Sequence, residues 1–521
     1  MSRLFRKKIL PLLLAALLCF TAGCGGNGGG DDGTNSASST AVIATPVPGD
    51  GTFGLFYNPN SSMNPYDVTD ANNLLICGFV YQNFLTVNND FQLEPNCVSE
   101  WSTTDGRVWS LKPNTEKAFP DGKALDANDL DYSFQCAIGS GRYESRFVSH
   151  VDATYVTEDG RLEITLSFVD YLFPYLLDIP VVENGTYSAA HPSGTGPFQF
   201  ASDGNSLVAN PKSEVAEDLQ LSQIHFETYS STDELNEKFE SGTVDMILND
   251  PTVASTLGLS NSNELREYNT TNLHYIGFNL LEDVFSDYRL QQAFENAVDR
   301  DYMADTIMEG NAMAAYTPIH PASPLNNKTL ESQLAYNLTT FKSELDAMGA
   351  KDTDGDGVLE YQSVPLSFTL LVCKDSSEKL RFADKFASDM KNYGVEIKVN
   401  ALEWSAYREA LFAGNFDMYY AEIRIPADFD LSCILAGDGA GAFNQKYDAQ
   451  NSANLSAFLA APDDTRQAAC NTMCQHIIDT GCIIPVCFEK HQIIFRYGTV
   501  KNMSLQVNGP SVNISQWELH L

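Results

Sequence analysis

The chain has 521 residues and a formal net charge of −36 at pH 7, with 68 acidic against 32 basic residues. Such an excess of negative charge repels phosphate backbones and anionic lipid surfaces, which excludes nucleic acid as a partner. The length and the 43% of hydrophobic residues suffice for two or three lobes with cores of their own.

The first 24 residues have the pattern of a secretory signal. A basic start precedes the apolar run Ile9–Phe20, and small residues precede Cys24; the basic residues are Arg3, Arg6, Lys7 and Lys8. Because the apolar run is too short to span a bilayer as a stable helix, we predict a cleaved signal peptide at residues 1–23. Small residues directly before a cysteine resemble the bacterial lipobox, in which the cysteine receives diacylglycerol after cleavage. An uncut anchor with an incidental cysteine is the alternative.

Residues 24–50 are rich in Gly, Ser, Thr and Asp, which predicts a flexible tether. We therefore expect the mature protein to be lipid-anchored through Cys24 at the bacterial cell membrane, facing the extracellular or periplasmic side. Loss of the signal changes the net charge from −36 to −40, because the signal carries four basic residues and no acidic ones.

The next stretch predicts a scaffold rather than a catalyst. A strand is expected at Gly54–Tyr57 and a helix at Leu74–Phe84. About forty residues from Leu93 then carry a recurrent series of Trp, Asp-Gly and helix-cap residues; these are Pro95, Trp101, Asp105-Gly106, Trp109, Phe119, Asp121-Gly122, Leu125, Asp126, Asn128, Tyr132 and Ser133. The Asp-Gly pairs close tight turns, and Asp126 or Asn128 caps the following helix.

A second informative stretch is Leu273–Pro321. It predicts a strand at Leu273–Leu280, a helix capped by Ser286 or Asp287, and an extended exit. The apolar residues of this helix recur at helical spacing and face a sheet; they are Leu290, Ala293, Phe294, Ala297 and Val298.

Together, the Trp/Asp-Gly series and the run from Ile276-Gly-Phe-Asn279 to Asp299-Arg300 resemble the extracellular solute-binding proteins of family 5, the peptide- and nickel-binding lipoproteins of bacterial ABC importers. The resemblance implies an α/β, two-lobed periplasmic-binding-protein-like fold of type II, with an extra subdomain in the first lobe. The expected divisions are residues 51–76, 191–270 and 481–521 for the core of lobe I, 77–190 for the extra subdomain, and 271–480 for lobe II.

The resemblance also implies the function. The protein is expected to be a monomer that captures a small solute, peptide favoured, between its lobes and delivers it to a membrane permease driven by ATPase subunits. It is expected to need no cofactor and to be no enzyme, since no nucleophile elbow, zinc-protease motif or phosphate loop occurs. A surface-anchored hydrolase or a structural lipoprotein is the alternative.

Lobe II contains further predicted elements. Strands at Leu366–Val372 and Val395–Val399 flank a helix at Glu378–Tyr393, which predicts a parallel pair. After lobe II, strands are expected at Ile483–Val486 and Gln492–Phe495, and they are expected to return to lobe I. Before them, an acidic turn resembles half of an EF-hand and is a weak calcium candidate, with an ordinary Asp/Gly turn as the default; its residues are Asp352, Asp354, Asp356 and Glu360.

The residues expected to bind the solute come from several segments. They are Tyr57, Asn58, Thr195, Trp404, Tyr407, Tyr420, Arg424 and Asp428. Thr195 lies in a Gly-Thr-Gly-Pro turn that resembles one of the family, and Trp404 and Tyr407 are placed as its cleft aromatics are. Ile423 and Pro426 stand where an aromatic and an acidic residue are expected, so Arg424 is the candidate for holding a carboxylate instead.

The cysteines leave two possibilities open. Without Cys19 and Cys24 nine remain, and an odd number predicts at least one free thiol or an intermolecular bridge. A cluster near the C-terminus matches no standard zinc spacing, which favours buried thiols or a disulfide; it comprises Cys470, Cys474, Cys482 and Cys487, with His476 close by.

Overall fold

The computed structural model describes residues 52–250, 259, 263–437, 439–510 and 514–520. The predicted signal peptide, Cys24 and the tether lie outside these residues. Within the described ranges, we find no helix that is both long and apolar enough to cross a bilayer.

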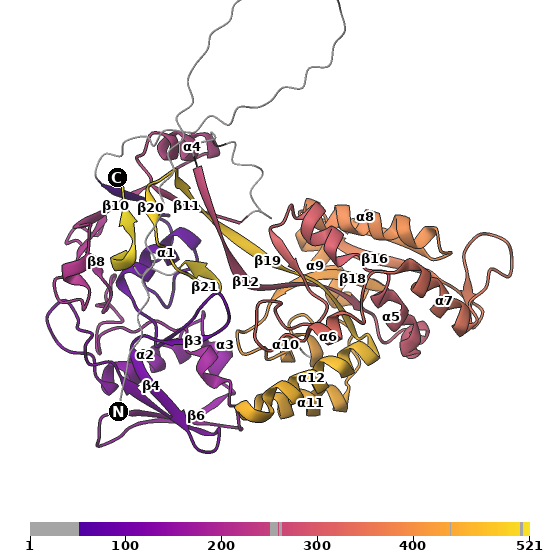
Figure 1. The fold of residues 1–521 in the computed structure, drawn as a ribbon, viewed down its shortest axis with the longest axis horizontal. Coiled ribbons are helices and arrows are strands. Elements are labelled where there is room, and N and C mark those ends of the chain that lie inside the picture. Colours follow the sequence, from indigo (N-terminus) through magenta and orange to yellow (C-terminus); the bar gives the residue numbers. More distant parts are fainter. Residues whose placement is uncertain (1–51, 251–258, 260–262, 438, 511–513, 521) are drawn as a thin grey trace, which may run out of the picture. The chain divides into compact units, whose positions relative to one another are not determined.

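One mixed sheet of eleven strands organises the described residues (Figure 1). Its order is β17 (Glu396–Leu402), β16 (Ser367–Cys373), β18 (Met418–Arg424), β12 (Asn263–Phe278), β19 (Ile483–Arg496), β11 (Met246–Asn249), β1 (Phe53–Phe56), β10 (Gln223–Glu227), β9 (Ser206–Ala209) and β8 (Phe198–Phe200), with β13 (Ala312–Ala314) also on β19. Strands β12 and β19 pair antiparallel from Asn263–Arg496 to Gly277–Ile483 and form its middle.

Two large hydrophobic cores and one smaller cluster lie on this sheet, and β12 and β19 contribute to both large cores. Tyr268 of β12 and Ile493 of β19 belong to the first core. Leu273 of β12 and Phe488 of β19 belong to the second core. Because the same two strands leave one core and enter the other, they form the connection between two lobes. The exact domain boundaries stay predictions.

The first lobe surrounds the first core. Its other elements are β2 (Leu85–Val87), β3 (Leu93–Pro95), a four-stranded sheet of β4 (Val98–Thr103), β5 (Val108–Pro113), β7 (Leu162–Leu166) and β6 (Val151–Val156), and helices α1 (Ala71–Val80), α2 (Ala127–Ile138), α3 (Glu144–Phe147) and α4 (Thr232–Glu240), with short 3-10 turns at Phe173–Leu176 and Ala216–Asp218. Near the C-terminus come β20 (Val500–Lys501), β21 (Leu505–Gln506), β22 (Gly509–Pro510), a 3-10 turn at Ile514–Gln516 and β23 (Glu518–Leu519).

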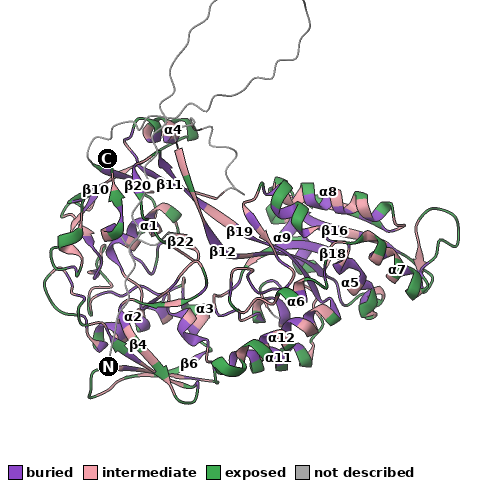
Figure 2. Ribbon diagram, viewed as in Figure 1, coloured by how far each residue is buried: buried purple, intermediate pink, exposed green. Residues whose placement is uncertain are grey.

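The second lobe packs helices on both faces of its part of the sheet. They are α5 (Tyr288–Glu295), α6 (Lys328–Glu331), α7 (Leu338–Met348), α8 (Ser377–Lys391), α9 (Trp404–Ala413), α10 (Ser432–Leu435), α11 (Ala449–Leu459) and α12 (Asp463–Thr480), with a 3-10 turn at Asp283–Ser286, a π-helical turn at Tyr302–Ile307, and the small hairpin of β14 (Glu360–Tyr361) and β15 (Val364–Pro365). Figure 2 shows the sheet largely buried and the outer helix faces exposed. This is the distribution that burial of apolar surface produces.

Several local predictions are confirmed. Asp287 caps α5 by accepting a hydrogen bond from the Arg289 amide. Asp126 caps α2, and Asp129 completes a capping box with it. Strands β16 and β17 pair in parallel around α8, as their sequence pattern predicts. Each feature depends on residues that are close in the sequence or on one regular crossover.

Other boundaries differ from the predictions. The first helix begins at Ala71 rather than Leu74, because the Asp70 carboxylate caps the amides of Asn72 and Asn73. The same helix ends at Val80. The two strands predicted at 483–486 and 492–495 are one continuous strand, β19. Two of the polar residues between them have partners on β12: Glu489 contacts His274, and Lys490 contacts Glu267.

Candidate functional site

A large hollow lies outside the carboxyl ends of three parallel strands. Strands β16, β17 and β18 run in the same direction, and helices α8 and α9 begin at this edge. A pocket of about 1090 Å³ opens there, lined by these strand ends, the two helix starts and residues 437 and 439–444. The crevice beyond the carboxyl ends of parallel strands is where open α/β sheets bind ligands.

One wall of this pocket is aromatic. Trp404 is 56% exposed and stacks on Tyr407, with ring centres 5.9 Å apart and planes 23° apart. The Arg408 guanidinium lies 5.7 Å from the centre of the Trp404 ring. The Tyr407 hydroxyl donates a hydrogen bond to the Tyr420 carbonyl at 2.9 Å, which fixes the wall against β18.

The opposite wall is the outer edge of β18. The Ile425 amide donates a hydrogen bond to the Thr271 carbonyl of β12. In an antiparallel pair every second residue bonds to the partner strand, so Ile425 and every second residue before it on β18 bond to β12. The residues between them direct their N–H and C=O groups away from β12. Tyr420 and Glu422 are among the latter. Because β16 pairs with β18 only at Met418 and Tyr419, the edge beyond those residues faces the pocket. An extended chain can add to such an edge by main-chain hydrogen bonds.

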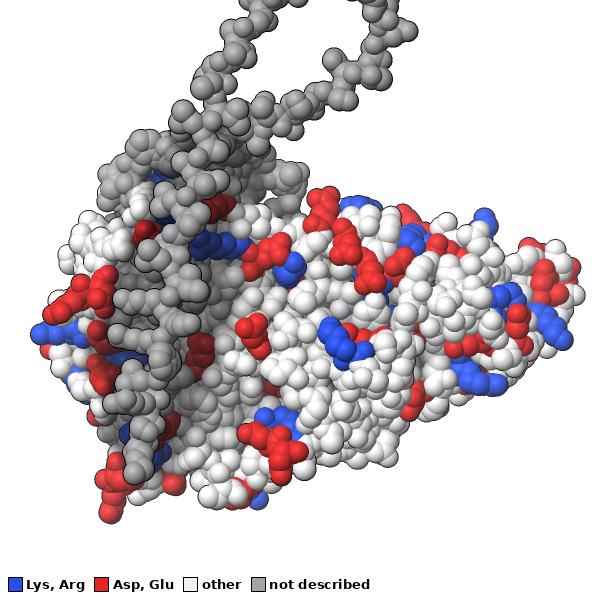
Figure 3. All heavy atoms as spheres, viewed as in Figure 1, with Lys and Arg blue, Asp and Glu red and all other residues white. Residues whose placement is uncertain are grey.

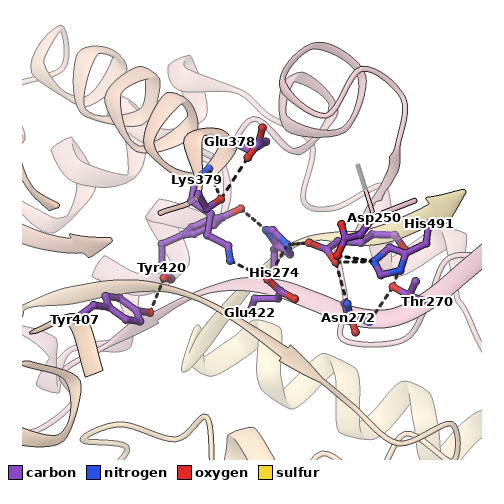
Figure 4. A network of polar contacts seen from close by, with 12 residues as sticks. Asp250, Thr270, Asn272, His274, Glu378, Lys379, Tyr407, Tyr420, Glu422 and His491 are labelled. Carbon is purple, nitrogen blue, oxygen red and sulfur yellow. Dashed lines mark hydrogen bonds and ion pairs between the residues drawn. The ribbon is translucent and has the colours of Figure 1, made fainter. Parts of the chain in front are cut away.

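A polar network lies where β18, β12 and β19 meet (Figure 4). His274 contacts Glu489 through Nε2 at 2.6 Å and the Tyr420 hydroxyl through Nδ1 at 3.1 Å. Burial alone would raise the pKa of Glu489, but His274 beside it holds that pKa well below its usual range. Glu422 pairs with Lys379 at 2.8 Å.

Three members of this network could in principle hold a metal ion, since ligand atoms of His274, Glu422 and Glu489 lie within 4.8 Å of one another. The Lys379 ammonium, however, already neutralises Glu422. The contacts of His274 join β12 to β18 and β19. The arrangement therefore acts as a hydrogen-bonded junction at the crossing strands.

A second pocket, of about 390 Å³, is lined by both lobes. The first lobe contributes most of its walls, including Tyr81, Tyr143 and Tyr268, and the second lobe contributes Arg424 and Ala427. Since Glu422 and Ile423 line the larger pocket and Arg424 lines this one, the end of β18 joins the two.

The structure brings together half of the predicted site residues. Trp404, Tyr407 and Tyr420 line the larger pocket, and Arg424 lines the smaller one. The assignment of these residues to solute binding remains a prediction.

The other four predicted site residues lie outside these two pockets. Tyr57 and Asn58 line a separate hollow, in which Asn58 bonds to Asp70 at 3.0 Å. Thr195 is buried and donates to Gln82 at 2.9 Å. Asp428 is also buried; its burial, together with nearby Asp170 and Asp430, raises its pKa well above the usual value. Neither Thr195 nor Asp428 lines either pocket.

Several pocket residues have no signal in the sequence. Lys379 and Arg408 occur in amphipathic helices, where solvated basic residues are ordinary. Arg142 and Arg146 lie around a one-turn helix, and their spacing alone indicates only a shared face. Arg142 and Arg146 become neighbours of Arg424 only because the fold brings distant segments of the chain together.

The weak calcium candidate forms an exposed turn. Asp352 accepts hydrogen bonds from the amides of Gly355 and Gly357, and Glu360 accepts two from Thr353. The four carboxylates approach within 4.8 Å. These hydrogen bonds to the backbone account for the turn, as expected for an ordinary Asp/Gly turn.

All nine cysteines among the described residues are free thiols. Seven of them are buried, including Cys470, Cys474, Cys482 and Cys487. The structure thus favours buried thiols over a disulfide in this cluster.

Comparison with known proteins gives consistent matches. Residues 92–429 match the profile of the bacterial extracellular solute-binding proteins, family 5. The oligopeptide-binding protein AppA of Bacillus subtilis is 22% identical over 464 residues, which are 85% of this chain and 82% of AppA.

Solved structures have the same fold. NikA from Brucella suis, solved with Fe(III)-EDTA, is 16% identical with a TM-score of 0.70, over 90% of this chain and 99% of NikA. The unliganded open form of the murein tripeptide-binding protein MppA is 15% identical with a TM-score of 0.73, over 91% of this chain and 99% of MppA. The predicted two-lobed, type II α/β fold is confirmed.

Proposed function

The chain belongs to the bacterial extracellular solute-binding proteins, family 5, and we propose that it captures a peptide in the two pockets joined by β18. The family provides ABC importers with their solute-binding component, so the protein is a binding protein of such an importer and not an enzyme. AppA, to which it is similar over most of its length, is named for oligopeptide binding.

The open edge of β18 carries this proposal. A peptide backbone pairs with the outward amide and carbonyl groups of Glu422, as an added strand does. One of its side chains enters the larger pocket and stacks on Trp404. Main-chain bonding tolerates many sequences, and the aromatic wall favours apolar or aromatic side chains.

Capture depends on the two lobes. Ligand that touches both lobes stabilises the closed arrangement, because only that arrangement contacts the ligand from both sides. The joining strands β12 and β19 then flex at their junction near Asn269–Leu273, where the register of their pairing shifts. The closed protein delivers its solute to the permease and ATPase subunits.

Attachment to the membrane is part of the same proposal. The protein acts as a monomer, held near the permease by diacylglycerol on Cys24 and by the tether 24–50, which raises its local concentration. Cys24→Ala should move the protein from the membrane fraction to the soluble fraction and abolish labelling by radioactive fatty acid. Unchanged membrane association would contradict the anchor.

Peptide binding is tested by thermal unfolding of the full chain with pools of random tetrapeptides. A ligand at a hundredfold excess over its Kd stabilises by about 2.7 kcal/mol, a rise of several degrees in Tm. Trp404→Ala should weaken the retained peptides about tenfold. Tyr447→Ala, an aromatic residue that is 73% exposed outside both pockets, should not. Absence of any shift would favour a structural lipoprotein, and peptide cleavage would favour a hydrolase.

A further inference from the structure

A hairpin of the first lobe reaches into the core of the second lobe. Leu85 of β2 belongs to the first core, whereas Phe91, in the turn between β2 and β3, belongs to the second core and is 2% exposed. The Phe91 ring stacks on the ring of Phe429 in the second lobe, with centres 5.4 Å apart, and its centre lies 4.6 Å from that of His320. Phe91, Phe429 and His320 line neither of the two pockets, so their contact does not require a solute.

The backbone of both stacked phenylalanines lies in the left-handed region. The angle φ is +58° at Phe91 and +58° at Phe429, a conformation that is unfavourable for a bulky side chain. The Asn88 carbonyl accepts a hydrogen bond from the Phe91 amide at 2.9 Å. The Asn88 side chain accepts two more, from the amides of Asp90 and Gln92 at 3.0 Å each. The turn therefore holds the ring at its tip, and burial of the ring in the other lobe offsets the strain.

A second segment of the first lobe makes the same crossing. Leu172, in the loop after β7, belongs to the second core. Beside it, the Tyr171 amide donates a hydrogen bond to the Leu459 carbonyl of α11 at 2.8 Å. The Tyr175 hydroxyl donates to the Phe91 carbonyl at 3.4 Å, so this segment also supports the hairpin.

The hairpin and its partners lie on opposite sides of the point where the joining strands flex. Asn269 of β12 donates to the Asn89 side-chain oxygen at 2.8 Å and to the Asn89 carbonyl at 2.9 Å, which fixes the hairpin to the first-lobe part of β12. The register shift follows Asn269. Beyond the shift, Leu273 pairs with Phe488, which packs against His320. Movement of one lobe relative to the other at this shift therefore draws the hairpin ring out of the second core.

We infer that Phe91, Phe429 and His320 form a clasp that holds the two lobes closed before any solute binds. The inference concerns the empty protein, and it rests on the flexing of β12 and β19 that the proposed function requires. Buried aromatic anchors carry much of the stabilisation of an interface. The clasp thus lowers the free energy that a solute must supply for closure, and it sets the fraction of the empty protein that is open.

The charge of the two lobes opposes the clasp. The chain has a net charge of −36, and acidic side chains are spread over both lobes on the face shown in Figure 3. Like charge on the two lobes favours their separation, and salt screens this repulsion. A closed empty protein therefore needs an attractive contact that does not depend on charge, which buried aromatic rings provide.

The experiment measures the radius of gyration of the purified, solute-free full chain by small-angle X-ray scattering. Phe91→Asn removes the ring and retains the turn, because asparagine tolerates a positive φ. Phe429→Asn removes the same stack from the second lobe. The matched control is Asp90→Asn, which places the same residue at the exposed neighbouring position of the turn.

A second control tests for a general loosening of a core. Phe134 is as buried as Phe91, but its neighbouring rings, Phe84 and Phe147, belong with it to the first core. Phe134→Leu should therefore lower the Tm without changing the radius of gyration.

We expect Phe91→Asn and Phe429→Asn each to increase the radius of gyration by about 1–2 Å. The double variant should expand no further, because both substitutions remove one contact. High salt should reverse part of the increase, and Asp90→Asn should have the wild-type radius. Peptides retained from the random tetrapeptide pool should bind Phe91→Asn about 3- to 10-fold more weakly, since a smaller fraction of this variant is closed.

The outcomes separate the clasp from peptide capture. Equal radii of the wild type and Phe91→Asn would overturn the clasp and leave peptide capture standing. An equal expansion of Phe134→Leu would show a general loosening and would also overturn the clasp. Expansion of the two clasp variants alone would support the clasp, even where no peptide of the pool raises the Tm of the wild type; that combination would overturn peptide capture only.

Discussion

His320 is a buried histidine held between aromatic rings. It has no exposed surface, and its ring centre lies 4.6 Å from that of Phe91 and 4.7 Å from that of Phe488. Nδ1 accepts a hydrogen bond from the Ala322 amide, and Nε2 has no partner among the described residues. Burial lowers the pKa of His320 to about 3, so the folded protein keeps it neutral.

The pH dependence of stability follows from this shift. The unfolded chain binds a proton at His320 below about pH 6.5 whereas the folded protein does not, so the contribution is complete above that pH and falls as pH decreases. Between pH 7 and pH 5 the wild type should lose about 2 kcal/mol relative to His320→Asn, in which the amide oxygen replaces Nδ1. Urea unfolding at both pH values measures the difference. Equal losses of unfolding free energy in the wild type and in His320→Asn would contradict this role of His320.

Arg300 and Arg289 lie in the same stretch and have opposite surroundings. Arg300 is 1% exposed, pairs with Glu295, and donates to the carbonyls of Pro485 at 2.8 Å and Ala315 at 3.1 Å. It thereby joins α5 to β19 and to the chain after β13. Arg289 pairs with Asp287 at the surface, with 57% of its side chain exposed.

Substitution should separate these two arginines. Arg300→Met removes the donor to a buried carboxylate and to the carbonyls of Glu295, Ala315, Leu334 and Pro485, and we expect a loss of about 3–5 kcal/mol in unfolding free energy. Arg289→Met should cost much less, because water replaces an exposed ion pair. Denaturant unfolding midpoints give both values. Similar losses would show that burial does not govern the contribution.

At the scale of elements, the pairing of β12 with β18 requires a glycine. Gly277 lies opposite Tyr419, and a Cβ atom on Gly277 would come within 2.1 Å of that ring. The ring cannot easily withdraw, because the Tyr419 hydroxyl donates to the Gly441 carbonyl at 3.0 Å. The glycine is thus needed for packing on the strand beside the larger pocket.

We expect Gly277→Ala to destabilise the protein by about 1–3 kcal/mol through overpacking. The control is Gly139→Ala at the end of α2, where φ is −85° and the nearest atom to an added Cβ is 3.5 Å away. That change should be close to neutral. Thermal unfolding of both variants measures the effect, and an equally small effect of Gly277→Ala would exclude a fixed Tyr419 ring.

At the scale of the whole molecule, we find no disulfide between the lobes in the part of the chain that the structure describes. All nine cysteines of the described residues are thiols, and two long strands join the two cores. Stability therefore comes from burial of apolar side chains in each lobe.

A thiol titration checks this description. The mature protein should react with nine equivalents of a thiol reagent under denaturing conditions, and reductant should not change its Tm. A tenth reactive thiol would indicate an unmodified Cys24. Seven or fewer would indicate a disulfide.

Local sequence patterns determined several helix caps, one parallel strand pair and the assignment to the family. The caps at Asp126 and Asp287 and the parallel pair around α8 follow from short-range hydrogen bonding and periodicity, and the Trp/Asp-Gly series identified the family and its two-lobed fold. Such signals survive in a single sequence because the residues that make them are close together in the chain.

Only the tertiary structure decided the composition of the site. It separated Trp404 and Arg424, which line pockets, from Thr195 and Asp428, which are buried. It also brought Arg146 of the first lobe to Arg424 of the second, and it made β19 a single strand. These features depend on contacts between distant segments, and desolvation and charge at a pocket wall exist only once those segments have come together.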